Sequence, residues 1–367
     1  MSIITLTDSQ NTEKNKIIQK FKSGANVAVL QGIAGSGKST ILPYIVEGLG
    51  MTPKQVWYTA YTGTATLNMR QSNSSTLHSL LYKPIIRYGK VVGFKNKDSM
   101  ELAEFLQGIR IIVADEFSMI PADIMDRLEA VCRNLGILLL LVGDYMQLPP
   151  VSGGVNKHYH TFDGKLVEPM RQALENPILW AANEVRQNKF VPGGMHGETL
   201  FIGRRADLHS DWLKPDVQFL CGLNATRESI NNQIMQRNTP AVGDRIIFLR
   251  NDFGNGVSNG TQATITGIQN TFGKMSLDII TEGVGEEFSL KALWRKEPSA
   301  ADRRQGYRTF ADFAACITTH KSQGLTISRS GVILDESRVF DRDGEKLSVR
   351  WQYTALTRFQ NKLIWLR

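Results

Sequence analysis

The sequence is poor in cysteine, with Cys132, Cys221 and Cys316 as the only three among 367 residues. These residues lie far apart, and the chain has no CxxC pair and no Cys/His cluster. Neither a disulfide framework nor a structural zinc site is therefore predicted. We expect all three thiols to pack in apolar cores in a reducing compartment.

Long apolar runs are also absent. The stretch MSIITLTDSQNTEKNK at the start lacks the apolar core of a signal peptide. The longest apolar runs, such as Ile137–Val142, are too short to span a bilayer. These absences predict a cytoplasmic protein without a membrane segment. No fixed-period repeat and no low-complexity segment is present either.

Acidic residues are the scarcer charged class, with 35 Asp and Glu against 43 Lys and Arg, which gives a net charge of +8. This surplus favours a polyanionic partner, nucleic acid first, although a merely basic protein would have the same composition. The length of the chain predicts two or more domains, because one hydrophobic core seldom serves so many residues.

Short apolar runs that end in polar or glycine-rich turns are typical of strands buried on both faces, as in parallel sheets. Helical patterns lie between several of them, for example Ser39–Leu49 and Pro121–Leu135. This alternation predicts an α/β fold with a doubly wound sheet. The predicted strands are Val27–Leu30, Val56–Thr59, Ile109–Ala114, Ile137–Val142, Phe313–Thr318 and Val332–Leu334.

Two stretches interrupt this alternation. Residues 82–98, YKPIIRYGKVVGFKNKD, alternate around a Tyr-Gly-Lys turn and predict a β-hairpin. Residues 242–308 are rich in Gly, Asn, Thr and short β-type runs, and predict a small all-β insertion. We therefore expect a first core at 1–81 and 99–165, the hairpin at 82–98, a second core at 166–241 and 309–367, and the β insertion at 242–308.

The segment GIAGSGKS, Gly32–Ser39, fits the phosphate-loop pattern G-x-x-x-x-G-K-[ST] between a predicted strand and a predicted helix. Gly32, Gly35 and Gly37 allow backbone N–H groups to turn toward phosphates, and the helix N-terminus adds partial positive charge. Lys38 supplies a charge to the β and γ phosphates, and the Ser39 hydroxyl can coordinate Mg²⁺. A nucleoside triphosphate is the expected ligand.

A second acidic element supports hydrolysis of this ligand. The segment IIVADEFSM ends a predicted buried strand with Asp115-Glu116. Asp115 can hold Mg²⁺ through water, and Glu116 can polarise the attacking water as a general base. An Asp-Glu pair alone is a weak signal, but its position after a buried strand and downstream of a phosphate loop makes it a strong one.

The order of further motifs resembles that of superfamily one DNA helicases, in the Dda and RecD-like group that includes a small bacteriophage helicase. The resemblance covers nearly the whole chain and implies two RecA-like cores, with a β-hairpin pin in the first and an SH3-like β insertion in the second. The motifs are LTDSQ at Leu6–Gln10, YTAYTGTAT at Tyr58–Thr66 (Ia), SSTLHSLL at Ser74–Leu81 (Ib), DEFSM (II), LVGDYMQLPPV at Leu141–Val151 (III), LVEPMRQ at Leu166–Gln172 (IV), ITTHKSQGLT at Ile317–Thr326 (V) and YTALTR at Tyr353–Arg358 (VI).

This resemblance implies a nucleotide site shared between the two cores. Gln147 would reach the γ-phosphate or the attacking water, and Arg171 and Arg358 would act as arginine fingers. A structural ion pair is the alternative role for each arginine. The implied nucleotide-binding residues are Gln10, Gly32, Ala34, Gly35, Ser36, Gly37, Lys38, Ser39, Thr40, Gln323 and Gly324, with ATP as nucleotide and Mg²⁺ bound by Ser39 and Asp115.

The resemblance also implies a path for single-stranded DNA along motifs Ia, Ib and V, with backbone contacts from hydroxyl, imidazole and basic groups. Two apolar residues of the hairpin would stack on the last base pair, although Phe94 could instead pack the hairpin against its core. The implied DNA-binding residues are Thr62, Thr76, His78, Pro84, Phe94, Thr319, His320 and Lys321.

The expected function is an ATP-dependent DNA helicase that moves 5′→3′ on single-stranded DNA, with forked DNA as a further partner. Alternatives are a translocase that strips proteins from DNA without unwinding it, and a binding module switched by nucleotide. RNA also remains open as a substrate. The resemblance further implies a monomer in a bacterial or phage-infected cell, with replication, recombination or repair as its setting and a single-strand-binding protein as a partner.

Overall fold

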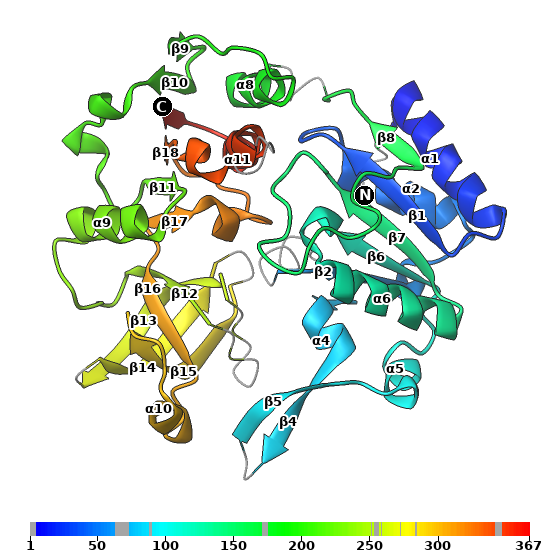
Figure 1. Cartoon of the computed structure of the whole chain (residues 1–367), viewed down its shortest axis with the longest axis horizontal. Helices are drawn as coiled ribbons and strands as arrows, with labels where there is room; N and C mark the ends of the chain where they lie inside the picture. Colours follow the sequence, from blue (N-terminus) through cyan, green and yellow to red (C-terminus); the bar gives the residue numbers. More distant parts are fainter. Residues whose placement is uncertain are drawn as a thin grey trace. The chain divides into compact units, whose positions relative to one another are not determined.

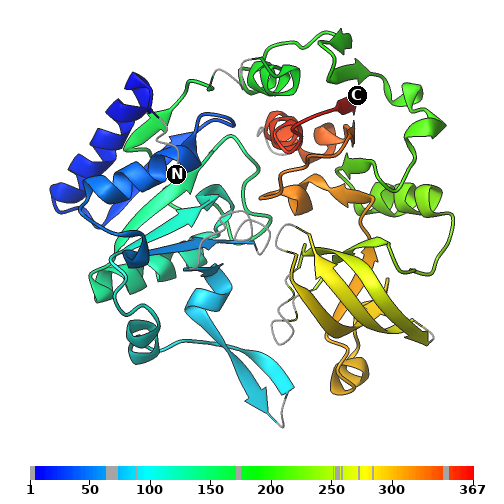
Figure 2. The same cartoon turned by 180° about the vertical axis from the view of Figure 1, so that it is seen from behind.

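The computed structural model describes residues 5–62, 73–87, 90–170, 175–250, 252, 257, 259–271, 273–282, 285–341 and 347–367, with the side chains at 84, 86, 87 and 90–93 left out. The chain forms two compact units (Figures 1 and 2). Most of the described residues up to Trp180 form the first unit, and Ala181–Arg367 form the bulk of the second. Each unit is described by itself.

A parallel six-stranded sheet in the order β3-β2-β6-β7-β1-β8 forms the centre of the first unit (Figure 1). Its central strands are buried on both faces, as their continuous runs of Val, Ile and Leu predict. The strands are β1 (Val27–Gly32), β2 (Val56–Ala60), β3 (Ser74–Thr76), β6 (Ile111–Asp115), β7 (Leu138–Gly143) and β8 (Gly164–Leu166).

Helices supply the apolar side chains that cover both faces of this sheet. The helices α1 (Asp8–Lys22) and α2 (Lys38–Gly48) pack in one buried cluster with alternate strand residues. A second buried cluster contains residues of α4 (Leu77–Leu81), α5 (Ser99–Phe105) and α6 (Ala122–Leu135). The helix α1 begins with a capping box in which Thr7 and Gln10 satisfy each other's backbone N–H groups. The short 3₁₀ turns η1 (Pro53–Gln55) and η2 (Phe117–Met119) complete this unit.

The predicted β-hairpin is present as a separate two-stranded sheet of β4 (Tyr82–Arg87) and β5 (Lys90–Asn96), directly after α4 (Figure 1). A two-stranded ribbon has little core of its own. Its base is held by Arg127 of α6, whose Nη2 donates to the carbonyl oxygens of Leu81 and Lys97 at 3.1 and 3.2 Å. The two ends of the hairpin are thus attached to α6.

The second unit contains another six-stranded sheet, in the order β17-β11-β18-β19-β10-β9, in which only β9 is antiparallel. Its strands are β9 (Gly194–His196), β10 (Leu200–Gly203), β11 (Gln218–Cys221), β17 (Cys316–Thr318), β18 (Gly331–Leu334) and β19 (Leu363–Leu366). Its helices are α8 (Pro177–Arg186), α9 (Asn224–Met235) and α11 (Leu347–Leu356), and its 3₁₀ turns are η3 (Arg205–Asp207), η4 (Ser210–Trp212), η6 (Thr319–Ser322) and η7 (Ser337–Phe340).

A closed five-stranded barrel is inserted between α9 and β17. Its interior is a separate apolar cluster that includes Phe248, Ile265 and Leu277. The strands are β12 (Arg245–Phe248), β13 (Gln262–Thr271), β14 (Lys274–Thr281), β15 (Glu287–Trp294) and β16 (Thr309–Phe313), with α10 (Ala300–Arg304) before β16. The first and last strands, β12 and β16, pair with each other and bring the two ends of the insertion together.

The predicted strand Phe313–Thr318 is in fact two strands, because Phe313 ends β16 in the barrel and Cys316 begins β17 in the second sheet. Two buried side-chain amides hold the junction. Asn231 Nδ2 donates to the carbonyl oxygens of Phe313 and Cys316, both at 3.0 Å, and Asn231 Oδ1 accepts from Cys316 N at 2.8 Å. Gln218 Nε2 donates to the carbonyl oxygens of Ala314 and Ala315 at 3.0 and 3.2 Å.

The boundary between the two cores also differs from the one expected at 165/166, because the first unit continues to Trp180. The strand β8 pairs with β1, and Met170 N donates to Gly35 O at 2.9 Å, so this stretch belongs with the phosphate loop. No helix within the described residues is long and apolar enough to cross a membrane.

Candidate nucleotide and nucleic-acid site

Three loops of the first unit leave neighbouring strands at the same edge of the sheet. The strand β7 lies between β1 and β6, and all three run parallel. Their carboxyl ends lead into the phosphate loop after Gly32, into Asp115-Glu116, and into the motif III loop from Asp144. Ligands of open α/β sheets bind outside the carboxyl ends of the strands, so the three motifs are positioned for one ligand.

The phosphate loop has a geometry that only glycine allows at two of its positions. A Cβ on Gly32 would lie 2.7 Å from Ser36 Oγ and 2.9 Å from Lys38 Cγ. Gly37 has a φ of +81°, and a Cβ there would lie 2.5 Å from Gln10 Nε2. The side chain of Ser36 is buried, and its Oγ donates to Ile33 O at 2.8 Å. The loop is therefore folded around a backbone cradle of the kind that binds phosphates.

Lys38 and Ser39 begin α2 directly after this cradle. Lys38 Nζ donates to the carbonyl oxygens of Gly32 and Ile33 at 2.8 and 3.1 Å, so the ammonium lies against the loop. Ser39 is exposed at the helix N-terminus, and Thr40 N donates to Gly37 O at 3.0 Å. The cation, the hydroxyl and the helix N-terminus converge where an anionic phosphate chain would bind.

Gln10 contacts the phosphate loop through its side chain, which is buried. Its Nε2 donates to Ser36 O and to Met170 Sδ, both at 3.2 Å, while its Oε1 accepts from Thr7 N at 3.1 Å. The expectation for this residue is a contact with the base of the nucleotide. In this structure Gln10 joins the phosphate loop at Ser36 to Met170 of motif IV.

Asp115 and Glu116 lie at the end of β6, both half-buried. Glu116 has a left-handed backbone with φ 49°, and its N–H donates to Asp115 Oδ1 at 2.9 Å. Positive φ is uncommon outside glycine and is concentrated at functional sites. The turn thus places two carboxylates side by side at the end of β6, a set that could serve a metal and a water.

The motif III loop is held by a residue that the sequence interpretation missed. The side chains of Asp144 and Gln147 are buried, Asp144 Oδ1 accepts from Met146 N at 3.0 Å, and Gln147 N donates to Asp144 O at 3.1 Å. The hydroxyl of Tyr159 then donates to Tyr145 O and Gln147 O at 3.0 and 3.3 Å. The sequence around Tyr159 does not predict this contact, because the partners of the hydroxyl are backbone atoms twelve and fourteen residues away.

Arg358 and Gln323 of the second unit are buried at 6% and 1% exposure. Arg358 lies just after α11, where its Nε donates to Thr354 O at 3.2 Å and its Nη2 to Thr357 Oγ1 at 3.1 Å. Gly324 has a φ of +79°, at the turn that follows η6. Arg171, the other expected arginine finger, lies outside the described residues.

Motif Ia begins within β2 of the first sheet, and motif Ib consists of β3 and α4. Thr62 is the last described residue of motif Ia and is partly exposed. Thr76 caps α4 by accepting from Ser79 N at 3.2 Å. The ring of His78 contacts those of Tyr61 and Tyr82, each 5.6 Å away between centroids, and burial lowers the pKa of this imidazole. A neutral, ring-flanked His78 suits stacking or hydrogen bonding better than a charge contact.

The hairpin presents an aromatic side chain to solvent. Phe94 on β5 is 45% exposed, which agrees better with a contact surface than with packing of the hairpin against the core. The backbone of Pro84 lies on β4, but its side chain is outside the described residues.

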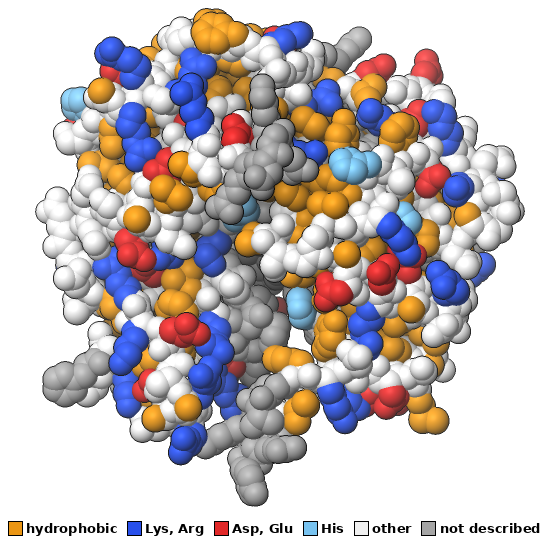
Figure 3. Space-filling view, viewed as in Figure 1, with side chains coloured by type: hydrophobic (Ala, Val, Ile, Leu, Met, Phe, Trp, Pro, Cys, Tyr) orange, Lys and Arg blue, Asp and Glu red, His pale blue; other side chains and the backbone are white. Residues whose placement is uncertain are grey.

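The three motif V residues differ in their accessibility. The side chain of Thr319 is fully buried and its hydroxyl donates to Cys221 O at 3.4 Å, so the geometry does not support its expected contact with DNA. His320 is partly exposed beside Phe340, at 5.4 Å between ring centroids. Lys321 Nζ donates to Asn259 Oδ1 of the barrel insertion at 2.6 Å. Figure 3 shows further Lys and Arg side chains over the barrel.

Comparison with known proteins finds one family model and several helicases that resemble this chain. A family model described as an AAA domain matches residues 6–189. The ATP-dependent DNA helicase PIF1 of Xenopus laevis is 34% identical over 170 residues, which are 42% of this chain and 25% of that protein. PIF1 of Mus musculus is 25% identical over 362 residues, which are 86% of this chain and 54% of that protein. The chain thus spans between about a quarter and about half of these relatives.

Solved structures show the same fold over nearly the whole chain. A structure of two coordinating Pif1 helicases at forked double-stranded DNA has a TM-score of 0.64 at 21% identity, and covers 99% of this chain and 92% of that one. Bacteroides Pif1 bound to single-stranded DNA has a TM-score of 0.61 at 21% identity, with the same coverage. The expected fold of two RecA-like cores is confirmed. The family model covers half of the chain, and the chain belongs to this AAA-domain family.

Proposed function

We propose that this chain is an ATP-dependent DNA helicase that moves along single-stranded DNA and unwinds duplexes. The observation that carries the proposal is the convergence of the phosphate loop, Asp115-Glu116 and the Gln147 loop at the carboxyl ends of three adjacent parallel strands. Curated relatives are named ATP-dependent DNA helicases, and a Pif1 structure of the same fold holds ADP-AlF₃ and single-stranded DNA.

The first core would bind ATP and position its attacking water. Lys38 would leave the carbonyl oxygens of its own loop for the β and γ phosphates, which offer it full negative charges. Glu116 would accept a proton from the water, and Gln147 would orient that water. In sites of this kind Mg²⁺ takes one or two oxygen ligands from the protein and the others from phosphates and waters. The exposed Ser39 hydroxyl and the Asp115 carboxylate can supply the protein oxygens, so the residues fit this ion. When bound, Mg²⁺ neutralises charge on the β and γ oxygens.

The second core would complete the site. Arg358 and Arg171 would stabilise charge that develops on the transferred phosphoryl group, and Gln323 with Gly324 would detect the γ-phosphate. Arg358 is buried among polar groups at the end of α11, which orients its guanidinium before nucleotide arrives. Hydrolysis would then drive alternating grip on the strand, and this would produce steps.

The DNA would follow motifs Ia, Ib and V, with Thr62, Thr76 and His78 on the first core and His320 with Lys321 on the second. Single strands are held by charge on phosphates and by stacking on aromatic rings. The tyrosines that flank His78 supply such rings. Phe94, and Pro84 with it, would stack on the last base pair at the fork and act as a pin.

Finer features of the proposal rest on the motif resemblance. These are the 5′→3′ direction, the grouping with Dda and RecD-like helicases, a bacteriophage or bacterial source, and action as a monomer in replication, recombination or repair, with a single-strand-binding protein as a partner. The rival reading of a protein-stripping translocase would show ATPase and movement without unwinding. A nucleotide-gated switch is disfavoured, because it does not require Glu116, Gln147 and Arg358 together.

Unwinding of 5′-tailed and 3′-tailed duplexes with ATP tests the proposal, with DNA-stimulated ATPase measured in parallel. We expect unwinding of the 5′-tailed substrate and stimulated hydrolysis. Hydrolysis without unwinding of either substrate would support the translocase instead. Nucleotide binding without hydrolysis would support the switch. A matched 5′-tailed substrate with an RNA tail decides between the two nucleic acids.

A further inference from the structure

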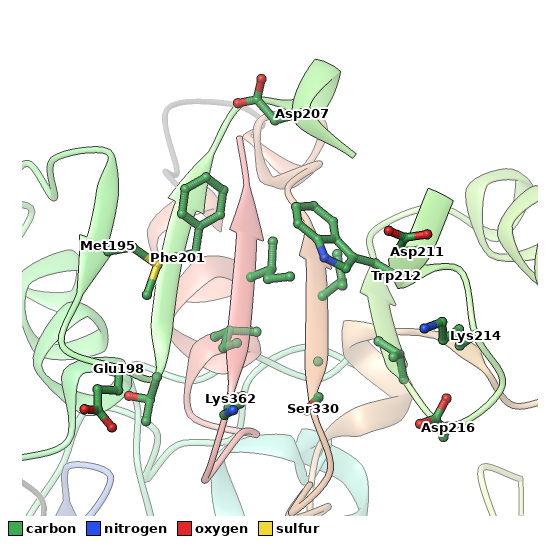
Figure 4. A pocket seen from close by; sticks show the side chains of 16 residues that line it. Met195, Glu198, Phe201, Asp207, Asp211, Trp212, Lys214, Asp216, Ser330 and Lys362 are labelled. Atoms are coloured by element: carbon green, nitrogen blue, oxygen red, sulfur yellow. The ribbon is translucent and has the colours of Figure 1, made fainter. Parts of the chain in front are cut away.

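The second unit has a groove outside the nucleotide and DNA residues discussed above, with a volume of about 620 Å³. Its floor is one face of the second sheet. Phe201 of β10 and Trp212 of η4 stand on this face, and Met195 of β9 is at one side (Figure 4). Met195 is 62% exposed. Large apolar side chains gathered in an open concave surface are typical of a contact site.

The groove exists because a covering helix is missing. The strands β10 and β11 are parallel, and a connection between parallel strands usually contains a helix that covers the sheet. The described connection from 204 to 217 contains only the three-residue turns η3 and η4. The helix α9 covers the neighbouring part of the same face, where Ile230 and Ile234 join the cluster that Phe201 and Trp212 contact. The part of this face beside α9 therefore has no helix over it within the described residues.

The rim of the groove has a charge opposite to that of the whole chain. Its lining includes the four carboxylates Glu198, Asp207, Asp211 and Asp216 and two lysines, Lys214 and Lys362. Asp207 is paired with the exposed Arg204, so these groups together give a local charge of −1 on a chain of +8. Figure 4 shows the labelled acidic side chains around the apolar floor. Such a rim repels nucleic acid and attracts a cationic partner.

We propose that this groove binds an amphipathic helix of a partner protein, with an apolar stripe on the Phe201–Trp212 floor and Lys or Arg residues at the acidic rim. The arrangement is that of helix-in-groove recognition, in which apolar residues one turn apart provide affinity and flanking charges select the partner. The helix takes the place that a crossover helix of the chain itself would fill. The surface is independent of the ATPase assignment.

The test measures fluorescence anisotropy of a labelled synthetic helix of about fifteen residues with a Leu stripe and Lys flanks. A peptide with Glu in place of every Lys is its matched control. Variant Asp211→Lys/Asp216→Lys reverses two exposed rim charges, and Glu287→Lys reverses an exposed charge on the barrel. Circular dichroism and DNA-stimulated ATPase check that all variants are folded.

We expect the Lys peptide to bind, the Glu peptide to bind at least about ten-fold more weakly, and the rim variant to lose about ten-fold in affinity for the Lys peptide, while Glu287→Lys changes it less than about two-fold. Equal binding of both peptides, or no binding of either, would overturn the proposal. Light scattering adds one more outcome. If the wild-type chain is a dimer and the rim variant is a monomer, the groove binds a second copy of the chain, and the proposal is overturned.

A different set of contacts carries a second inference, which rests on the proposed function. The turn at 156–161 contacts three parts of the ATP site through buried polar groups. Asn156 Nδ2 donates to Phe117 O and Ile120 O at 3.0 and 2.9 Å, just after Glu116. The Tyr159 hydroxyl bonds the motif III backbone at Tyr145 and Gln147. Gln31, which precedes the phosphate loop, donates through Nε2 to the carbonyl oxygens of Tyr159 and Thr161 at 3.2 and 2.7 Å.

We infer that Asn156 and Tyr159 are positioning residues for Glu116 and Gln147. One short turn fixes the distances between the loops that bear the general base and the water-orienting amide, and a shift of about 1 Å in such a constellation costs up to about a hundred-fold in rate. Both side chains are 2% exposed, so their hydrogen bonds form with little competition from water. Neither residue would touch the nucleotide.

Tyr159→Phe tests this inference because it removes a single hydroxyl from a buried ring, and Tyr307→Phe in the barrel is the matched control. We expect kcat for DNA-stimulated ATP hydrolysis to fall about ten-fold while KM and nucleotide affinity change less than about two-fold and Tm falls by only a few degrees. An unchanged kcat in Tyr159→Phe beside an active wild type would refute the positioning role. An inactive wild type would instead refute the proposed function, so the two failures are distinguishable.

Discussion

Lys321 of motif V donates a 2.6 Å hydrogen bond to Oδ1 of Asn259, which joins the turn after β17 to the barrel insertion. Burial, and then the neighbouring charge of Arg227, lower the pKa of this ammonium to about 8. The group is therefore charged below pH 8 and becomes neutral as the pH rises through that value. If Lys321 contacts the strand as proposed, this pKa would make strand affinity depend on pH in an accessible range.

The first prediction concerns this pH dependence. Affinity for a single-stranded oligonucleotide at low salt should fall by about three- to ten-fold between pH 7 and 9, because one phosphate contact loses its cation. Lys321→Met should bind weakly with a flat profile over the same range, and its salt slope should decrease by about 0.7. Lys296→Met, on the exposed loop after the barrel strand β15, is the control. A Lys321→Met profile as steep as that of the wild type would contradict the assignment.

The second prediction concerns the phosphate loop. Lys38→Ala should lower DNA-stimulated ATP hydrolysis by at least about a hundred-fold, because Lys38 is the cation that lies against the loop. Binding of single-stranded DNA should persist. Lys22→Ala, an exposed lysine at the end of α1, should leave hydrolysis intact. Steady-state ATPase and fluorescence anisotropy measure the two effects, and undiminished hydrolysis in Lys38→Ala would remove the basis of the nucleotide site.

The third prediction separates binding from chemistry. Glu116→Gln keeps the shape of the side chain but removes its basicity, so hydrolysis should fall by about a hundred-fold or more while ATP affinity stays within about two-fold. Glu104→Gln, on the exposed side of α5, is the matched change. Pre-steady-state and equilibrium binding measurements decide the outcome. A loss of affinity as large as the loss of rate would make Glu116 a structural residue of the β6 turn.

The fourth prediction concerns the pin. Phe94→Ala should lower the rate of fork unwinding by about five- to ten-fold while translocation on single strands and ATPase are retained, because stacking on one base is worth about 1–3 kcal/mol. Phe190→Ala removes another exposed phenylalanine, one far from the hairpin in the sequence. Equal unwinding rates in wild type and Phe94→Ala would mean that Phe94 only packs the hairpin and does not contact the fork.

The fifth prediction concerns stability. Asn231→Ala removes a buried amide that makes three hydrogen bonds to the junction between β16 and β17. Loss of these bonds leaves buried backbone groups unsatisfied and should cost about 3 kcal/mol or more in free energy of unfolding. Gln233→Ala, exposed on the same helix, should cost less than about 0.5 kcal/mol. Chemical denaturation measures both, and similar midpoints for the two variants would show that the junction does not depend on Asn231.

The sequence predicts the strands and the helix around the phosphate loop and the acidic pair well, because their signals are local. The Gly32–Ser39 pattern requires a strand before it and a helix after it, and β1 and α2 are both present. The acidic pair at Asp115 likewise follows a run of four fully buried residues. In these motifs the residue types and the backbone shape that they need are encoded within a few positions of each other.

The remaining features depend on contacts between distant residues. Asn156 and Tyr159 act through backbone atoms of other loops, so no spacing of side-chain types marks them. The run from Phe313 to Thr318 looks like one strand because its hydrophobicity is continuous, yet the chain passes between two sheets within it. Thr319 has the residue type of a phosphate contact, but its position at the end of β17 buries it.

The junction between the barrel and the second sheet has a mechanical consequence. Only Ala314 and Ala315 separate β16 from β17, and Gln218 and Asn231 lock the backbone on both sides. Because this linker is so short, we expect the barrel to move together with the motif V turn as one rigid body, and not as a flexibly linked domain. A displacement of the barrel would then be passed on to the motif V turn, and a reporter dye on the barrel would detect movement of that turn.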